Sequence, residues 1–281
     1  FIGGGFISFE FGHIAARAGS EVCMIDRGER PLKGFDADLV ERLVARGEEV
    51  GVQLRRRTSL KSIKKDGTDF LVTVETDSET KDLRADLVVH GAGRVAAIDQ
   101  LDLAAANVEA GDKGVAVNAY LQSTSNPKIY AAGDAADTQG APLTPVAVFE
   151  GKVAASNMLK GNRTKPDYSG VPSAVFTVPE LTRVGMLEQD ARETGHDIRV
   201  VENDTGDWYS NLRVGESCAA TKVIIDKDSD TILGAHLLGP EYGEIINFFG
   251  LAIRLGLTTS DLKKMVSVYP SVGSDLGSML S

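Results

Sequence analysis

The glycine-rich stretch at the start of the chain constrains the fold more than any other feature. Residues 1–26 are FIGGGFISFEFGHIAARAGSEVCMID. The spacing Gly3-x-Gly5-x-x-Ser8 is typical of the turn between the first strand and the first helix of a dinucleotide-binding βαβ unit. Gly3 permits the tight turn, Gly5 lets a pyrophosphate approach the backbone, and Ser8 is small enough for close helix–strand packing. The helix N-terminus would donate amide hydrogens to the phosphates.

The residues after this turn supply the context that the motif requires. Apolar side chains at helical spacing predict a helix from Ser8 to Gly19, and VCMID predicts a short buried strand that ends at Asp26. An acid at this distance from the first glycine accepts a hydrogen bond from the ribose 2′-OH of NAD. Arg27 and Lys33 could instead hold the 2′-phosphate of NADP. The sequence leaves the choice between NAD and NADP open.

Hydrophobic and turn patterns divide the rest of the chain into further elements. We expect a helix over 36–50, three strand-like runs with Asp66-Gly67 as the hairpin turn between the first two, and a buried strand over Leu87–Val89. A second region contains KIYAAGDAAD, a predicted strand that ends at Gly133-Asp134, and a helix over Leu143–Leu159. A third contains antiparallel strands with a polar turn at 227–230 and an amphipathic helix in GPEYGEIINFFGLAIRLGL. The predicted class is α/β.

Composition excludes several classes of function. The formal charge of −10 and the pI near 5.0 argue against nucleic acid, whose phosphates need clustered Lys and Arg. No apolar run approaches the roughly 20 residues that a membrane span needs. Cys23 and Cys218 have neither the spacing of a redox pair nor that of a metal site, and no signal for secretion is present, so we expect a reducing cytoplasm.

Five motifs in sequence order resemble one family. GGGFISFEF, DRGERPLKGFD, VVHGAGR, IYAAGDAAD and LTPVA are similar to segments of the FAD-dependent pyridine nucleotide–disulfide oxidoreductases, which include glutathione reductase, dihydrolipoamide dehydrogenase and mercuric reductase. The resemblance implies a Rossmann-like NAD(P)-binding domain over 1–94, the C-terminal piece of an FAD-binding domain over 95–166, and an α+β dimerisation domain over 167–281. It implies a homodimer that passes electrons from NAD(P)H through FAD to a disulfide or another small-molecule acceptor.

The resemblance also implies roles for individual residues. Glu10 matches the acid that pairs with a lysine beside the flavin, and that lysine belongs to a segment the chain lacks, so we expect Glu10 to have lost its partner. Phe6, with Ile7 beside it, stands where the family has an aromatic gate over the flavin. Gly93 and Arg94 match the Gly-Arg pair at which the family's chain returns to the FAD domain. Asp134, after Gly133, matches the aspartate that contacts FAD near its ribityl–pyrophosphate portion, and Thr144 matches a threonine near the flavin. The resemblance therefore implies that these five residues bind a cofactor.

Two departures from the family pattern bear on the acceptor. By the resemblance, the family's redox cysteine pair belongs to an N-terminal FAD segment that we expect this chain to lack. The family's His-Pro-Thr-x-x-Glu is replaced by Tyr269-Pro270-Ser271-Val272-Gly273-Ser274-Asp275. Tyr269 takes the place of the acid–base His, and a tyrosine with an ordinary pKa of about 10 is a poor base at neutral pH. The usual reduction of glutathione or lipoamide is therefore in question, and a quinone, a metal ion or a small disulfide are alternative acceptors.

Other interpretations remain open at this point. We expect the chain to be a fragment of a flavoenzyme, inactive by itself. A nucleotide-binding and dimerisation module without turnover is the alternative from another class, and a parent that transfers hydride between NADH and NADPH is a third. The four histidines show no metal-ligand spacing, and His236, on the apolar stretch AHLLG, is the best candidate for an interface residue.

Overall fold

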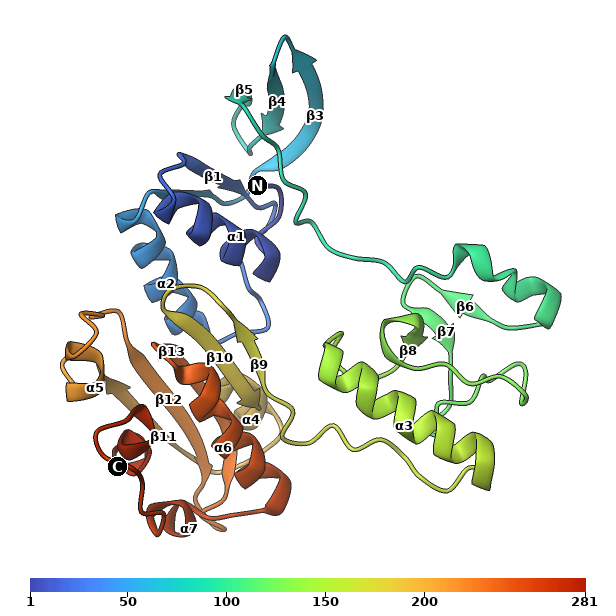
Figure 1. Cartoon of the computed structure of the whole chain (residues 1–281), viewed down its shortest axis with the longest axis vertical. Coiled ribbons are helices and arrows are strands. Elements are labelled where there is room, and N and C mark those ends of the chain that lie inside the picture. Colours follow the sequence, from blue (N-terminus) through green and yellow to red (C-terminus); the bar gives the residue numbers. More distant parts are fainter. The chain divides into compact units, whose positions relative to one another are not determined.

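The computed structural model describes all residues from 1 to 281 and contains two compact units (Figure 1). The first unit combines Phe1–Gly93 with Pro172–Ser281, and the second consists of Arg94–Val171. None of the helices combines the length and the apolar character that crossing a bilayer would require.

The first unit begins with the glycine turn and a short αβαβ segment. Its elements are α1 (Phe6–Arg17), β1 (Val22–Ile25), α2 (Ala37–Glu49) and β2 (Val52–Arg55). Strand β2 runs parallel to β1, with Val22 opposite Val52. Asp36 caps α2, because its Oδ1 accepts the amides of Asp38 and Leu39 at 3.1 and 3.2 Å. The helices predicted here are confirmed, but β2 was not predicted from the sequence.

A three-stranded antiparallel ribbon follows, as predicted. It consists of β3 (Ser59–Asp66), β4 (Asp69–Glu75) and β5 (Thr80–Ala85) in that spatial order. The hairpin between β3 and β4 turns at Gly67, whose φ of +67° lies in the left-handed region that glycine adopts without strain.

The strand predicted over Leu87–Val89 is wrong. His90 forms an isolated parallel bridge with Ile2, which also bridges Ile25, and no ladder extends through the preceding residues. Leu87 is 73% exposed. An apolar run becomes a buried strand only if a neighbouring strand pairs with it along its length. Here only His90 is paired, so no strand forms.

The C-terminal part of the first unit is a five-stranded antiparallel sheet. The spatial order is β11 (Ile198–Asp204), β12 (Ala220–Asp226), β13 (Ile232–Gly239), β10 (Glu180–Gly185) and β9 (Ser173–Val175). The connecting helices are α4 (Glu188–Glu193), α5 (Tyr209–Leu212), α6 (Tyr242–Leu255) and α7 (Thr259–Lys263), followed by two 3₁₀ turns, Val272–Asp275 and Ser278–Leu280. The strands around the 227–230 turn and the long helix are confirmed, whereas β11 was not predicted.

The two faces of this sheet pack against different partners. One face packs on α6, with Val223, Leu237 and Phe249 in the shared core. The other packs on α1 and α2 through a core that joins Phe9 and Leu43 to residues of the sheet, among them Leu181, Ala220 and Leu238. The N-terminal segment and the C-terminal sheet therefore share one hydrophobic core.

The second unit is built around α3 (Thr144–Lys160). Its other elements are short: β6 (Ala110–Gly111), β7 (Gly114–Ala116), β8 (Ala136–Asp137) and the 3₁₀ turns Asp99–Leu101, Leu103–Ala106 and Gly133–Ala135. The predicted helix is confirmed, with Pro145 in its first turn. The predicted strand before Gly133 is wrong: Tyr130 makes one isolated bridge to Gln122, and the paired residues are instead Ala136 and Asp137.

Candidate functional site

The glycine turn packs so closely against the protein that a side chain at Gly3 or Gly4 would clash. Gly3 has a φ of +102°, and a Cβ there would lie 2.6 Å from the carbonyl oxygen of Gly91. A Cβ on Gly4 would lie 2.3 Å from Asp26 Oδ2. Gly5 is the extended N-cap of α1 and has no capping side chain, so the first amides of the helix are free to donate to a ligand.

Ser8 allows α1 to pack closely on the crossing chain. Its side chain is fully buried and its hydroxyl has no hydrogen-bond partner. A Cβ on Gly91 would lie 2.2 Å from Ser8 Oγ, so a larger residue at either position would force the helix away from the backbone. This is the packing role that the fingerprint assigns to its third small residue.

Asp26 lies at the end of β1 and faces the glycine turn. Its Oδ1 accepts the amide of Gly28 at 3.1 Å, while its Oδ2 lies beside Gly4 and accepts no hydrogen bond within the protein. Arg27 and Lys33 are exposed and make no ion pair, although a Cβ on Gly28 would lie 3.5 Å from Lys33 Nζ. The arrangement therefore leaves one carboxylate oxygen available to a hydroxyl, with two unpaired cations on the same loop.

The first turns of α1 carry the other residues predicted to contact cofactors. Phe6 is 43% exposed and Ile7 is half-buried. Glu10 accepts a hydrogen bond within the chain, because the amide of Phe176 donates to Glu10 Oε1 at 2.8 Å. The predicted pairing of Glu10 with a lysine beside the flavin stays a prediction. This contact joins α1 to the segment between β9 and β10.

In the second unit, most of the predicted flavin-contact residues surround one cavity of about 540 Å³. Arg94, Gly133, Asp134 and Thr144 line it, whereas Gly93 does not. Arg94 Nη2 lies 3.2 Å from Asp134 Oδ2 and donates to the carbonyl oxygen of Pro142 at 2.9 Å. Both charged side chains are about half exposed, so their ion pair contributes only about 0–1 kcal/mol and either group can turn to a ligand.

Sequence reasoning missed Glu150, which holds the loop beside this cavity. Its buried carboxylate accepts hydrogen bonds from the Gly133 amide at 2.6 Å, from Thr138 Oγ1 at 2.8 Å and from the Tyr168 hydroxyl at 2.6 Å. Burial and the hydrogen bond to Glu150 raise the pKa of Tyr168 to about 12. The sequence contains a signal that could have identified Glu150. It lies four residues after Val146 and three before Val153, which places an acid on the buried face of α3.

Tyr269 lies on the surface and has no acidic partner. It is 76% exposed and stacks on Tyr209, with ring centroids 6.4 Å apart. Ser274 instead donates to the carbonyl oxygen of Ser271 at 2.5 Å, and Asp275 accepts from Ser210. The structure therefore does not bring Ser274 or Asp275 to Tyr269 as the family's Glu would be brought to its His.

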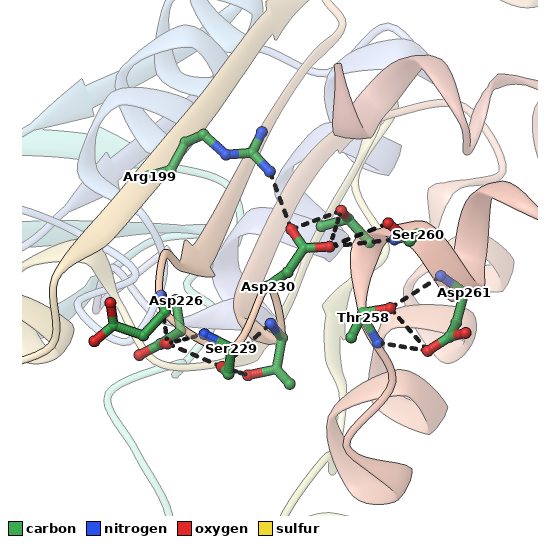
Figure 2. Close-up of polar contacts among 10 residues, drawn as sticks. Arg199, Asp226, Ser229, Asp230, Thr258, Ser260 and Asp261 are labelled. Atoms are coloured by element: carbon green, nitrogen blue, oxygen red, sulfur yellow. Dashed lines mark hydrogen bonds and ion pairs between the residues drawn. The ribbon is translucent and has the colours of Figure 1, made fainter.

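The remaining histidines and acids do not form a second site. The predicted role of His236 at an interface is wrong, because its side chain is fully buried and offers no surface to a partner. The acids around the β12–β13 turn are occupied by donors of the protein itself (Figure 2). Asp226 accepts from Ser229, Asp230 from Thr259, and Asp261 from Thr258. No group of three or more His, Cys, Asp or Glu side chains is arranged to hold a metal ion.

Comparison with known proteins identifies related sequences over the whole chain. The profile of the pyridine nucleotide-disulphide oxidoreductases matches residues 1–151, and that of their dimerisation domain matches residues 171–279. A Staphylococcus aureus protein described as "uncharacterized 19.7 kDa protein in mercuric resistance operon" is 51% identical over 180 residues, which cover 64% of this chain and all of that protein. Mercuric reductase of Bacillus cereus is 32% identical over 276 residues, which cover 98% of this chain and 43% of the enzyme.

A solved structure agrees with these matches. The Cu(II) complex of the HOCl-induced flavoprotein disulfide reductase RclA from Escherichia coli superposes with a TM-score of 0.89 at 27% identity. The alignment covers 99% of this chain and 62% of that protein. The chain spans about half the length of the mercuric reductases that it matches.

Proposed function

Because the chain belongs to the pyridine nucleotide-disulphide oxidoreductase family, we propose that it forms the nicotinamide-nucleotide site, part of the flavin site and the dimer contact of an NAD(P)H-dependent flavoenzyme. The family uses FAD and NAD(P)H. The proposal divides the chain into a nucleotide-binding domain (1–94), a flavin-binding piece (95–166) and a dimerisation domain (167–281). The bare backbone at Gly4, with Asp26 directly beside it, is the observation that carries the proposal.

We propose that NADH is preferred over NADPH. Asp26 Oδ2 accepts no hydrogen bond within the protein and is available to a ribose 2′-hydroxyl. A 2′-phosphate at the same place would meet a carboxylate of like charge. Arg27 and Lys33 would reduce this repulsion, but both are exposed, where charges are screened by water and salt.

The cavity of the second unit suits the polar part of FAD. Gly133 has a φ of +64°, and a Cβ there would lie 2.8 Å from Ala147 Cβ, so the loop approaches α3 as only glycine allows. Arg94, Asp134 and Thr144 would contact the ribityl and pyrophosphate groups. Bound FAD would supply the two-electron chemistry between the nicotinamide and the acceptor. The chain's own residues would bind and orient each cofactor.

For the acceptor we propose a small molecule that needs no acid–base histidine. The exposed Tyr269 without a carboxylate partner supports this choice over glutathione or lipoamide. Two relatives carry a metal in their names, mercuric reductase and the Cu(II) complex of RclA, so a metal ion comes first among the alternatives and a quinone second. We propose a cytoplasmic homodimer, and the two free thiols, Cys23 and Cys218, suit a reducing compartment.

Nucleotide titration of the purified chain tests the central point. We expect a lower Kd for NADH than for NADPH, and we expect Asp26→Asn to raise the Kd for NADH about 10-fold through loss of a charged hydrogen bond. The exposed Glu21→Gln variant is the control and should bind both nucleotides normally. Equal binding of NADH by Asp26→Asn and the unchanged protein would contradict the proposal.

An absorption spectrum separates the enzyme from the alternative without turnover. A flavin band with NADH-dependent dye reduction would support the flavoenzyme. Nucleotide binding with neither property would favour the second candidate, a binding and dimerisation module without turnover.

A further inference from the structure

The loop between β1 and α2, residues 27–35, borders the proposed nucleotide site and is held from two sides. We call it the nucleotide loop. On the side of the glycine turn, the amide of Leu32 donates to the carbonyl oxygen of Gly4 at 2.9 Å, and the Leu32 side chain is buried. The amide of Arg57 donates to the carbonyl oxygen of Gly28 at 3.0 Å. These contacts hold the loop at Gly28 and at Leu32.

The other side of the loop is held by Arg183 of β10, which lies far away in the sequence. One guanidinium nitrogen of Arg183 donates to the carbonyl oxygen of Gly34, and the other donates to the carbonyl oxygen of Gly185 at 2.9 Å. Burial lowers the pKa of Arg183, and Asp190 partly offsets this effect. A guanidinium remains protonated in proteins, so both bonds are charge-assisted.

The end of the loop is held by Lys222 of β12. Its buried Nζ lies 3.1 Å from Asp36 Oδ2 and 2.6 Å from Asp38 Oδ2. Asp36 is also the N-cap of α2, so Lys222 fixes the residue at which the loop becomes helix. Burial would lower the pKa of Lys222, but the hydrogen bonds to Asp38 and Asp36 raise it above its usual value, which keeps the ammonium charged.

The register of the sheet places these two cations on one face. Arg183 is opposite His236, and His236 is opposite Lys222, across β10, β13 and β12. His236 is fully buried, its Nε2 donates to the carbonyl oxygen of Met186 at 2.9 Å, and its Nδ1 has no partner. Burial lowers the pKa of His236, so a neutral imidazole separates the cations.

We propose that Arg183 and Lys222 are positioning residues for the nucleotide site, so that the C-terminal sheet sets how the chain discriminates NADH from NADPH. This inference rests on the proposed nucleotide function. The nucleotide loop carries Arg27 and Lys33, and its Gly28 amide holds Asp26 Oδ1. If the hydrogen bond from Arg183 to Gly34 is lost, the loop becomes free to move. The side chains of Asp26, Arg27 and Lys33 would then lose their fixed positions together.

Arg183→Met tests the proposal because methionine preserves much of the apolar stem and removes both donors. We expect its Kd for NADH to rise about 10-fold, as for loss of a charge-assisted hydrogen bond, and the ratio of the NADPH and NADH dissociation constants to move toward one. If Arg183 had a purely structural role, the dissociation constants for NADH and NADPH would rise by the same factor. If Arg183→Met fails to fold, Arg183→Lys, which keeps the charge, takes its place in the same measurements.

Arg42→Met is the matched control. Arg42 of α2 pairs with Asp204 of β11 at 2.9 Å and so also joins the helix to the sheet, but it does not contact the nucleotide loop. We expect this variant to keep both dissociation constants within about 2-fold, as for an exposed ion pair.

Amide hydrogen exchange of residues 28–35 without nucleotide separates this proposal from the proposed function. Faster exchange in Arg183→Met but not in Arg42→Met supports the positioning role, even if the unchanged chain binds neither nucleotide and the proposed function fails. Unchanged exchange in Arg183→Met overturns the positioning role, as does a fall in affinity that is equal for both nucleotides.

Discussion

Among single residues, Glu150 joins several segments beside the cavity of the second unit. Its carboxylate accepts from the loop at Gly133, from Thr138 and from Tyr168, and none of its surface is exposed. A buried carboxylate requires such donors, because burying an unpaired charge is costly. The three bonds therefore stabilise both the residue and the geometry of the loop.

Glu150→Gln should weaken this arrangement, because the amide presents donors to groups that already donate. We expect the free energy of unfolding to fall by about 1–3 kcal/mol, measured by urea titration with circular dichroism. The pKa of Tyr168 should also fall from about 12, measured by ultraviolet absorbance. Glu109→Gln, an exposed change in the same unit, is the control. An unchanged Tyr168 titration would contradict this account.

Among the elements, the β12–β13 turn is tied to the N-terminus of α7. Asp230 has a φ of +56° and accepts from Thr259 Oγ1 at 2.7 and 2.8 Å, with Arg199 3.4 Å away (Figure 2). The hydrogen bond from Thr259 lowers the pKa of Asp230. The pKa of Asp226, lowered chiefly by the Ser229 amide, and that of Asp261, lowered chiefly by Lys264, are about 2.

These shifts predict a loss of stability in acid. Because the folded pKa values lie below the unfolded value near 3.8, the carboxylates stabilise the fold above about pH 4. This contribution disappears as the pH falls toward about 2. Asp230→Asn should lower the urea midpoint at pH 7, and its difference from the unchanged protein should shrink at pH 2. Asparagine tolerates the left-handed backbone, so the change removes mainly the charge.

Asp228→Asn is the control for this experiment, because Asp228 lies in the same turn, is exposed, and takes part through its backbone amide, which donates to Asp226. A difference between Asp230→Asn and the unchanged protein that is equally large at pH 7 and pH 2 would show that the charge of Asp230 does not stabilise the turn.

In the whole molecule, several exposed apolar side chains of the C-terminal part lie on the elements that carry two stacked tyrosines, Tyr209 and Tyr269. Tyr209 and Leu212 lie on α5, Val268 precedes Tyr269, and the two tyrosines are stacked. We call these four residues the tyrosine patch. An exposed apolar cluster of this kind is typical of a contact between subunits, and it lies within the dimerisation-domain match.

Val268→Asp should convert the proposed dimer into a monomer, because the charge would be desolvated at the contact. The mass in solution, measured by size exclusion with light scattering, checks this. Leu87→Asp is the control, since Leu87 is comparably exposed, at 73% against 81%, but lies outside the dimerisation-domain match. A Val268→Asp protein that remains a dimer would exclude the tyrosine patch from the interface.

Features that depend on neighbouring residues were predictable from the sequence. The glycine turn, the cap of α2 at Asp36 and the hairpin at Gly67 each follow from local backbone preferences. The place of Asp26 directly after β1 was equally local, because it follows from the motif. The predicted roles of Gly3, Gly5 and Asp26 remain predictions, although the structure places all three residues at one turn.

What depends on distant partners was decided only by the tertiary structure. The apolar run at Leu87–Val89 and the run before Gly133 lack the strand neighbours that would make them strands, and β2 and β11 form because such neighbours exist. Glu150, Arg183 and Lys222 look ordinary in the sequence. Their importance comes from desolvation and from donors or acceptors brought close by packing, as when Arg183 reaches Gly34 across 149 positions of the chain. Local preferences carry no information about such contacts, because their energy exists only once the core has formed.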